Sequence, residues 1–125
     1  MELKQGDLEN IILNALWTME EEENNRIDVK DVQEKIKNDQ QSWAYTTVKT
    51  VLDRLVEKEL VLRVKDGKKY LYNSAISRQQ AGESAVKKLA RQYFRNNYKE
   101  LVTCAQKVGT GQKKETKKPE LVSAI

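Results

Sequence analysis

The segment Trp43–Lys58 constrains the fold of this chain more than any other stretch, because its apolar residues follow a strict helical spacing. Val48, Val51, Leu52 and Leu55 recur at i, i+3, i+4 and i+7, which corresponds to one face of a helix. The pattern predicts an amphipathic helix that buries this face in a hydrophobic core.

The opposite face of this predicted helix carries short hydroxyl and cationic side chains instead of the usual mixture of Glu and Lys. It consists of Thr46, Thr47, Lys49, Thr50 and Arg54. Short hydroxyls allow close approach to another surface, cations favour an anionic one, and the free N–H groups of a helix start suit phosphate. One hypothesis is therefore the recognition helix of a winged helix-turn-helix that binds DNA. The alternative is a helix whose threonines only face water, and these residues alone do not decide between the two.

The segment before this helix favours the DNA-binding hypothesis. The apolar spacing over Val29–Asn38 predicts a short helix, which Asp28 can cap and whose first turn Asp31 complements electrostatically. A polar turn, Asn38–Ser42, follows it. Two short helices joined by a tight polar link, the second rich in hydroxyls, are the pattern of a helix-turn-helix.

The segment after the helix predicts a β-hairpin. Two β-rich runs in Leu60–Asn73 flank the dipeptide Asp66-Gly67, which is a strong hairpin signal. A two-residue turn at this dipeptide would pair Lys65 with Lys68, an arrangement that costs little in isolation and makes sense if the tip approaches phosphate. The hairpin is then the wing, with Lys65, Lys68 and Lys69 facing DNA. A basic hairpin that only faces solvent is the alternative.

The first part of the chain predicts a helix that completes the core. We expect it to run from Asp7, its N-cap, to Met19, with an acidic loop over residues 20–25.

Two further helices are predicted after the hairpin. Ser77 and Gln80 form a capping box at the start of a helix that extends to about Asn96, and a second helix spans Tyr98–Val108. Their apolar seam is too long for the small winged-helix core to cover, so part of it must meet another helix or another chain. We therefore predict a winged-helix domain over residues 1–76, a dimerisation arm over 77–108 and a flexible Lys-rich tail over 109–125. The predicted dimer residues are Ala85, Leu89, Tyr93, Phe94, Leu101, Val102 and Ala105.

Charge is distributed unevenly along the 125 residues. Residues 1–39 carry a net charge of −6, residues 40–76 carry +3 and residues 77–108 carry +5. The positive charge starts where the predicted recognition helix starts, which indicates a polyanionic partner on one face.

Composition argues against several classes of protein. The chain has no His and no evident pair of acid and base, so we expect no enzyme, metal site or cofactor. One Cys cannot form an internal disulfide, which fits a reducing cytoplasm. No apolar run approaches the roughly 20 residues of a membrane span, and the N-terminus does not resemble a signal peptide, so we expect no membrane partner.

Several motifs resemble the penicillinase-repressor family of winged-helix transcriptional regulators, which includes the BlaI, MecI and CopY repressors. They are Leu8-Glu9, Leu13, Leu16-Trp17, the run from Ala44 to Leu55, and Lys58, Leu60, Arg63, Gly67, Tyr70 and Tyr72. The resemblance covers roughly residues 5 to 105. It implies a mainly α fold with a small β-hairpin, in which a winged helix-turn-helix precedes a C-terminal helical dimerisation arm.

The resemblance also implies a function. Members are homodimeric repressors that bind short inverted-repeat operators, often with a TACA/TGTA-type core. The match places Thr46, Thr47 and Thr50 in the major groove, with Lys49 and Arg54 nearer phosphate, although Arg54 could instead brace the helix through a carboxylate such as Asp53 or Glu57. The full set of predicted DNA contacts is Tyr45, Thr46, Thr47, Lys49, Thr50, Arg54, Lys65, Lys68 and Lys69.

The chain departs from the family in the residues that respond to inducers. The copper-responsive branch carries a C-terminal cysteine cluster, whereas this chain has only Cys104. The β-lactam branch is cleaved at an Asn-Phe bond, which Leu101–Gln106 lacks. Neither induction route carries over, so the inducer is unknown.

Cys104 itself supports two readings. Neighbouring Lys99 and Lys107 could favour its thiolate, so a redox switch or an inter-subunit disulfide is one hypothesis, and a small buried hydrophobe is the other.

For the whole chain, the alternative to a repressor is a winged-helix protein-interaction module that does not bind DNA. A repressor variant that senses a small molecule is also open.

Overall fold

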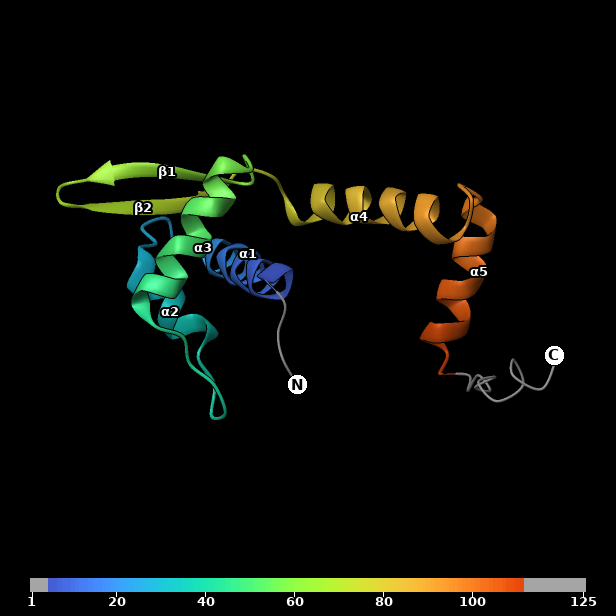
Figure 1. Cartoon of the computed structure of the whole chain (residues 1–125), viewed down its shortest axis with the longest axis horizontal. Helices are drawn as coiled ribbons and strands as arrows, with labels where there is room; N and C mark the ends of the chain where they lie inside the picture. Colours follow the sequence, from blue (N-terminus) through green and yellow to red (C-terminus); the bar gives the residue numbers. More distant parts are fainter. Residues whose placement is uncertain (1–4, 112–125) are drawn as a thin grey trace. The chain divides into compact units, whose positions relative to one another are not determined.

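The computed structural model describes residues 5–111, which form five helices and one two-stranded antiparallel sheet (Figure 1). Residues 1–4 and 112–125 lie outside the described part, and with them most of the predicted tail. The chain divides into two compact units, Met1–Gly82 and Glu83–Ile125. This mainly α architecture with one hairpin confirms the predicted fold class.

Helix α1 (Gln5–Glu21) begins and ends two residues beyond the predicted helix. Asp7 is therefore not the N-cap. It lies in the first turn, where a carboxylate complements the helix dipole. Glu20 and Glu21 belong to the helix rather than to an acidic loop. Glu20 accepts hydrogen bonds from the backbone N–H and hydroxyl of Ser74 at 2.6 and 2.7 Å, and these bonds offset the repulsion between neighbouring carboxylates.

Helix α2 (Val29–Ile36) starts with the predicted cap. Asp28 Oδ1 accepts the N–H of Asp31, and the Asp31 carboxylate accepts the N–H of Asp28, so the two form a capping box. The helix ends two residues before the predicted Asn38, because the Asn38 side chain accepts the N–H groups of Gln40 and Gln41 at 2.8 Å each.

Helix α3 (Tyr45–Glu57) confirms the helix predicted from the Trp43–Lys58 segment, and its residues Val48, Val51, Leu52 and Leu55 are buried as expected. Its end is a Schellman motif, in which Glu59 adopts a positive φ of 65° and the N–H of Leu60 reaches the carbonyl of Leu55 at 3.0 Å. This sharp stop leads the chain directly into the hairpin.

Strands β1 (Val61–Asp66) and β2 (Lys69–Ser74) form the predicted hairpin, but the predicted pairing of Lys65 with Lys68 was wrong. Lys65 pairs with Tyr70, and Asp66 pairs with Lys69. The central turn residues are therefore Gly67 and Lys68 rather than Asp66 and Gly67.

Two physical effects favour the observed register. Gly67 adopts a φ of +67° at the first central position, where a type II′ turn needs a positive φ. The pairing also replaces two opposed lysines with an Asp66–Lys69 pair, and it sets Lys65 Nζ 5.3 Å from the centre of the Tyr70 ring.

The core of the first unit lies between the three N-terminal helices and the hairpin. Ile12 and Leu16 of α1, Val32 of α2 and Leu52 of α3 meet in it, and Tyr72 of β2 is fully buried against them. The segment before α2 extends this edge of the hairpin, because the N–H of Tyr72 donates to the Ile27 carbonyl at 2.8 Å. The core therefore fixes α3 and the hairpin as one body.

The last two helices are α4 (Arg78–Tyr93) and α5 (Tyr98–Gly109). Ser77 and Gln80 form the predicted capping box with bonds of 2.9 and 3.0 Å. Helix α4 stops three residues before the predicted Asn96, because Arg95 and Asn96 adopt positive φ angles.

Candidate nucleic-acid interface

The outer face of α3 is an exposed surface of hydroxyl groups. The side chains of Thr46, Thr47 and Thr50 are exposed, and Tyr45 beside them is 44% exposed. The N-cap residue Ala44 has no side chain that can bond the first N–H groups of the helix. These amides and hydroxyls face outward together, an arrangement that suits phosphate and base edges.

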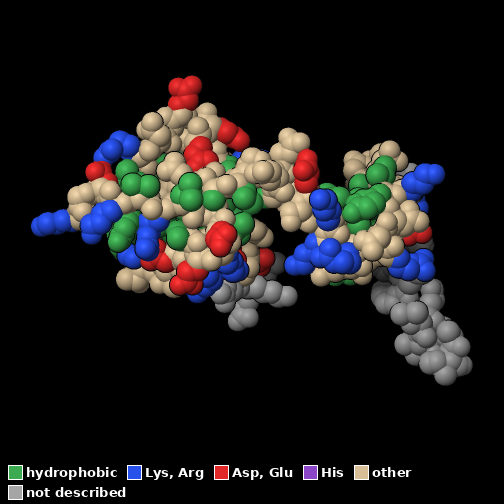
Figure 2. Space-filling view, turned by 90° about the horizontal axis from the view of Figure 1, so that it is seen from above, with side chains coloured by type: hydrophobic (Ala, Val, Ile, Leu, Met, Phe, Trp, Pro, Cys, Tyr) green, Lys and Arg blue, Asp and Glu red, His purple; other side chains and the backbone are tan. Residues whose placement is uncertain are grey.

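The hairpin adds positive charge beside this face. Figure 2 shows Lys and Arg side chains around the free end of the hairpin in the first unit. Lys65, Lys68 and Lys69 are all exposed. Among the described residues, Lys68 has no carboxylate partner, whereas Lys69 Nζ lies 2.9 Å from Asp28 Oδ2.

A cleft of about 300 Å³ joins the start of α3 to the hairpin. Four of the predicted DNA contacts line it, two from each element: Tyr45, Lys49, Lys68 and Lys69. Asp28, Val29, Lys30, Tyr70 and Tyr72 complete its wall. The cleft is therefore cationic and aromatic, with Asp28 as the carboxylate in its wall.

The ion pair in this cleft shifts two pKa values. Burial would raise the pKa of Asp28, but the hydrogen bonds from the Asp31 backbone and from Lys69 outweigh it and lower the pKa. The same bond to Asp28 raises the pKa of Lys69. Both groups are therefore charged at neutral pH.

A second carboxylate, that of Asp53, connects α3 to both strands. Its Oδ2 accepts from Lys49 Nζ at 2.7 Å, and its Oδ1 accepts from Arg63 Nη1 and from the Tyr72 hydroxyl at 3.0 Å each. Burial would raise the pKa of Asp53, but these three donors lower it. Burial and the bond to Asp53 raise the pKa of Tyr72.

A third carboxylate, that of Glu9, holds the far end of α3 against α1. The Glu9 side chain is only 10% exposed, and Lys58 Nζ lies 2.8 Å from its Oε1. Arg54 Nη1 lies 3.9 Å from Glu9 Oε2, so Arg54 pairs with a carboxylate outside α3. Of the five cations predicted to face DNA, Lys49, Arg54 and Lys69 thus have carboxylate partners within the chain.

Sequence reasoning missed the roles of Asp53, Glu9, Asp28 and Arg63 in this site. The spacing of Lys49 and Asp53 at i, i+4 was a readable signal for one ion pair. The other contacts join residues that lie far apart in sequence. Arg63 also stacks over the Tyr70 ring at 4.3 Å, and Arg26 pairs with Asp66 at the hairpin tip.

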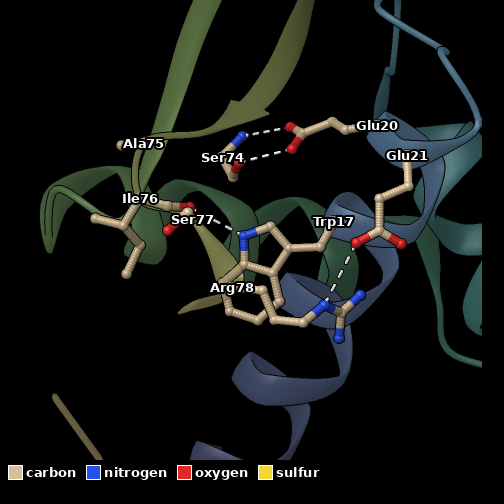
Figure 3. A pocket seen from close by; sticks show the side chains of 8 residues that line it. All are labelled: Trp17, Glu20, Glu21, Ser74, Ala75, Ile76, Ser77 and Arg78. Carbon is tan, nitrogen blue, oxygen red and sulfur yellow. Dashed lines mark hydrogen bonds and ion pairs between the residues drawn. The ribbon is translucent and has the colours of Figure 1, made fainter. Parts of the chain in front are cut away.

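A different hollow, of about 440 Å³, lies where α4 leaves the winged-helix unit (Figure 3). The Trp17 indole N–H donates to the Ile76 carbonyl at 3.0 Å, and the Arg78 guanidinium lies 5.2 Å from the Trp17 ring. Arg78 Nε also lies 3.5 Å from Glu21 Oε2. These contacts fix the first residues of α4 to α1.

The arm exposes much of its predicted apolar seam. Leu89 is 43% exposed and Tyr93 is 73% exposed, while Phe94 and Leu101 are half-buried. Ala85, Val102 and Ala105 are also exposed. The Cys104 thiol is free and exposed, and it shares an open hollow with Lys99 and Lys107.

Residues 5–111 contain neither a cluster of metal-binding side chains nor a membrane-spanning helix. In this part of the chain, no three His, Cys, Asp or Glu side chains gather so as to hold a metal ion. No helix there combines the length and apolar content needed to cross a membrane.

Comparison with known proteins agrees with this geometry. Two curated relatives from Mycobacterium tuberculosis, strains CDC 1551 / Oshkosh and ATCC 25618 / H37Rv, are both named Transcriptional regulator BlaI. Each is 39% identical to this chain over 67 residues. The matched region covers 54% of this chain and 45% of each relative, so the chain spans about half the length of these relatives. The family model described as Penicillinase repressor matches residues 5–118. The chain therefore belongs to the penicillinase-repressor family of transcriptional regulators.

Proposed function

We propose that this regulator is a sequence-specific DNA-binding repressor that acts as a homodimer on an inverted-repeat operator. One observation carries the proposal. The start of α3, which carries the exposed hydroxyl face, and the cationic hairpin share one cleft, which Tyr45, Lys49, Lys68 and Lys69 line. A helix that enters the major groove while a hairpin reaches the backbone needs this arrangement.

The residues of the two elements take different roles in this proposal. Thr46, Thr47 and Thr50 read base edges, because short hydroxyls donate and accept hydrogen bonds in the major groove. Lys68, together with Lys65 and Lys69, contacts phosphates and sets the position of the helix on the duplex. Tyr45 and the first N–H groups of α3 contact the backbone at the groove edge.

The arm provides the surface that binds a second copy of the chain. Side chains such as Leu89 and Tyr93 expose apolar area that a symmetric partner would cover. Two recognition helices would then read half-sites about one helical turn, ~34 Å, apart. Because the two subunits of such a dimer are related by two-fold symmetry, the operator needs the same symmetry.

Selection of duplexes from a random library, followed by fluorescence anisotropy across a salt series, tests the proposal. We expect enrichment of an inverted repeat, with one dimer per site and far tighter binding than to a scrambled duplex. Equal and steeply salt-dependent binding to both duplexes would reduce the function to a general basic patch. Absence of binding at low salt would favour the protein-interaction module instead.

A further inference from the structure

Asp53 stands out because one carboxylate receives donors from three elements of the winged-helix unit. Lys49 lies one turn earlier on α3, Arg63 lies on β1 and Tyr72 lies on β2, all within 2.7–3.0 Å of its oxygens. Two of these donors are cations, Lys49 on α3 and Arg63 on the hairpin. A single negative charge therefore holds two positive charges.

This arrangement exceeds what the packing of the unit requires. The buried residues of α3, among them Leu52 and Leu55, already attach the helix to the core, and Glu9 joins it to α1. The Asp53 side chain is still 29% exposed, and it lies on the same helix as the exposed threonines. Its bond to the buried Tyr72 hydroxyl serves the fold, but its bonds to the two cations are not needed for packing.

We infer that Asp53 is a specificity-determining residue, which restrains the Lys49 and Arg63 head groups and so limits sequence-independent binding to phosphate. The inference rests on the proposed DNA-binding function. Unrestrained cations meet the phosphates of any duplex, because the backbone is the same in every sequence. Restrained cations add affinity only where the duplex brings a phosphate to them.

The size of the effect follows from counterion release. Each phosphate neutralised by a cation contributes about 0.9 to the slope of log affinity against log salt, which is roughly an eightfold gain at 0.1 M salt. Release of one or both cations should thus steepen the slope on a scrambled duplex by about 0.9 to 1.8, and it should favour that duplex more than an operator, where the restrained cations already contact phosphate.

The substitution Asp53→Asn tests this inference, because an amide can still accept from Tyr72 but cannot hold two cations. We expect tighter binding to a scrambled duplex by roughly eightfold or more at 0.1 M salt, a steeper slope and a smaller ratio of operator to scrambled affinity. Glu57→Gln is the matched control, since it removes the same charge from an exposed position on the same helix and should change this ratio little. A protein that only lost stability would bind both duplexes more weakly, in proportion to the unfolded fraction seen by circular dichroism.

A second comparison does not depend on the folding of the Asp53 variant. Lys49→Gln removes a cation that Asp53 already restrains, whereas Lys68→Gln removes one without a carboxylate partner among the described residues. Lys68→Gln should flatten the salt slope on the scrambled duplex by about 0.9, and Lys49→Gln should flatten it much less. Equal flattening by the two, or equal behaviour of Asp53→Asn and Glu57→Gln, would overturn the inference while operator binding by the unmodified protein stands. If the unmodified protein shows no preference for a selected operator, the proposed function fails, and the inference fails with it.

Discussion

Asp28 contributes to stability in two ways, as the N-cap of α2 and as the ion-pair partner of Lys69. Two substitutions at this position can measure the two contributions separately. Its side chain caps α2 by accepting the Asp31 N–H at 2.9 Å, and it pairs with Lys69 on the hairpin. Loss of a good N-cap typically costs about 1 kcal/mol, within a range of about 0.5–2 kcal/mol. Asn caps a helix about as well as Asp but cannot form the ion pair.

We therefore expect Asp28→Ala to be about 1 kcal/mol less stable than Asp28→Asn, which corresponds to roughly 4–8 °C in Tm for a unit of this size. Urea and thermal unfolding followed by circular dichroism measure both variants. Asp28→Asn should lie close to the unmodified protein, because the Lys69 side chain is 56% exposed and water weakens its pair with Asp28. Equal destabilisation by the two substitutions would refute the assignment of the stability to the cap.

The same residue predicts a dependence of stability on pH. Because the folded state lowers the pKa of Asp28 below its ordinary value of 3.8, its ionised form stabilises the protein fully above that value. This stabilisation is lost as the pH falls from there through the lower pKa of the folded state. The stability difference between the unmodified protein and Asp28→Ala should be constant near neutral pH and should shrink only below about pH 4. A difference that already shrinks between pH 7 and 5 would contradict this sign and this window.

Three further predictions concern base readout, the core and the arm. Thr47→Ala should reduce discrimination between operator and mutated operator by about 1–3 kcal/mol in anisotropy titrations, whereas Thr47→Ser, which keeps the hydroxyl, should lose less. Leu52→Ala should lower the free energy of unfolding by about 2–5 kcal/mol in urea, because the Leu52 side chain is fully buried and its truncation leaves a cavity. Leu89→Asp should shift sedimentation toward monomer without loss of helix content, and Gln92→Asp, the same charge at an exposed polar position of α4, should not. An unchanged sedimentation profile for Leu89→Asp would place the dimer contact elsewhere.

Local signals in the sequence were sufficient for the starts of α2 and α4 and for the buried face of α3, but not for the start of α1. The capping boxes Asp28–Asp31 and Ser77–Gln80 involve residues three apart, so their geometry depends on little beyond the helix itself. The apolar spacing of α3 identified its buried face for the same reason. Helix ends were less predictable, because a side-chain turn at Asn38 and positive φ angles at Arg95 and Asn96 stop helices that the apolar pattern would continue.

The hairpin register could not be chosen from the alternation of side chains. The expected and observed pairings differ by two residues on β2, as when Arg63 pairs with Tyr72 instead of Tyr70. A shift of two keeps every side chain on the same face of the sheet, so the apolar pattern fits both registers equally well. The observed register instead agrees with the positive φ of Gly67, with the pairing of Asp66 and Lys69, and with a contact outside the hairpin, the bond from the Tyr72 N–H to the Ile27 carbonyl.

The same limit applies to the charges of the candidate interface, with a consequence for mechanism. Sequence shows that Lys49, Arg54 and Lys69 are cations on or near the predicted recognition helix, but only the fold brings Asp53, Glu9 and Asp28 to them. Paired cations contribute less to indiscriminate attraction than a count of lysines and arginines implies. Under the proposed function, affinity for the operator should then depend more on the threonine hydroxyls of α3 and on the exact placement of the hairpin. We expect such a regulator to have lower general DNA affinity and a larger difference in affinity between its operator and other sequences.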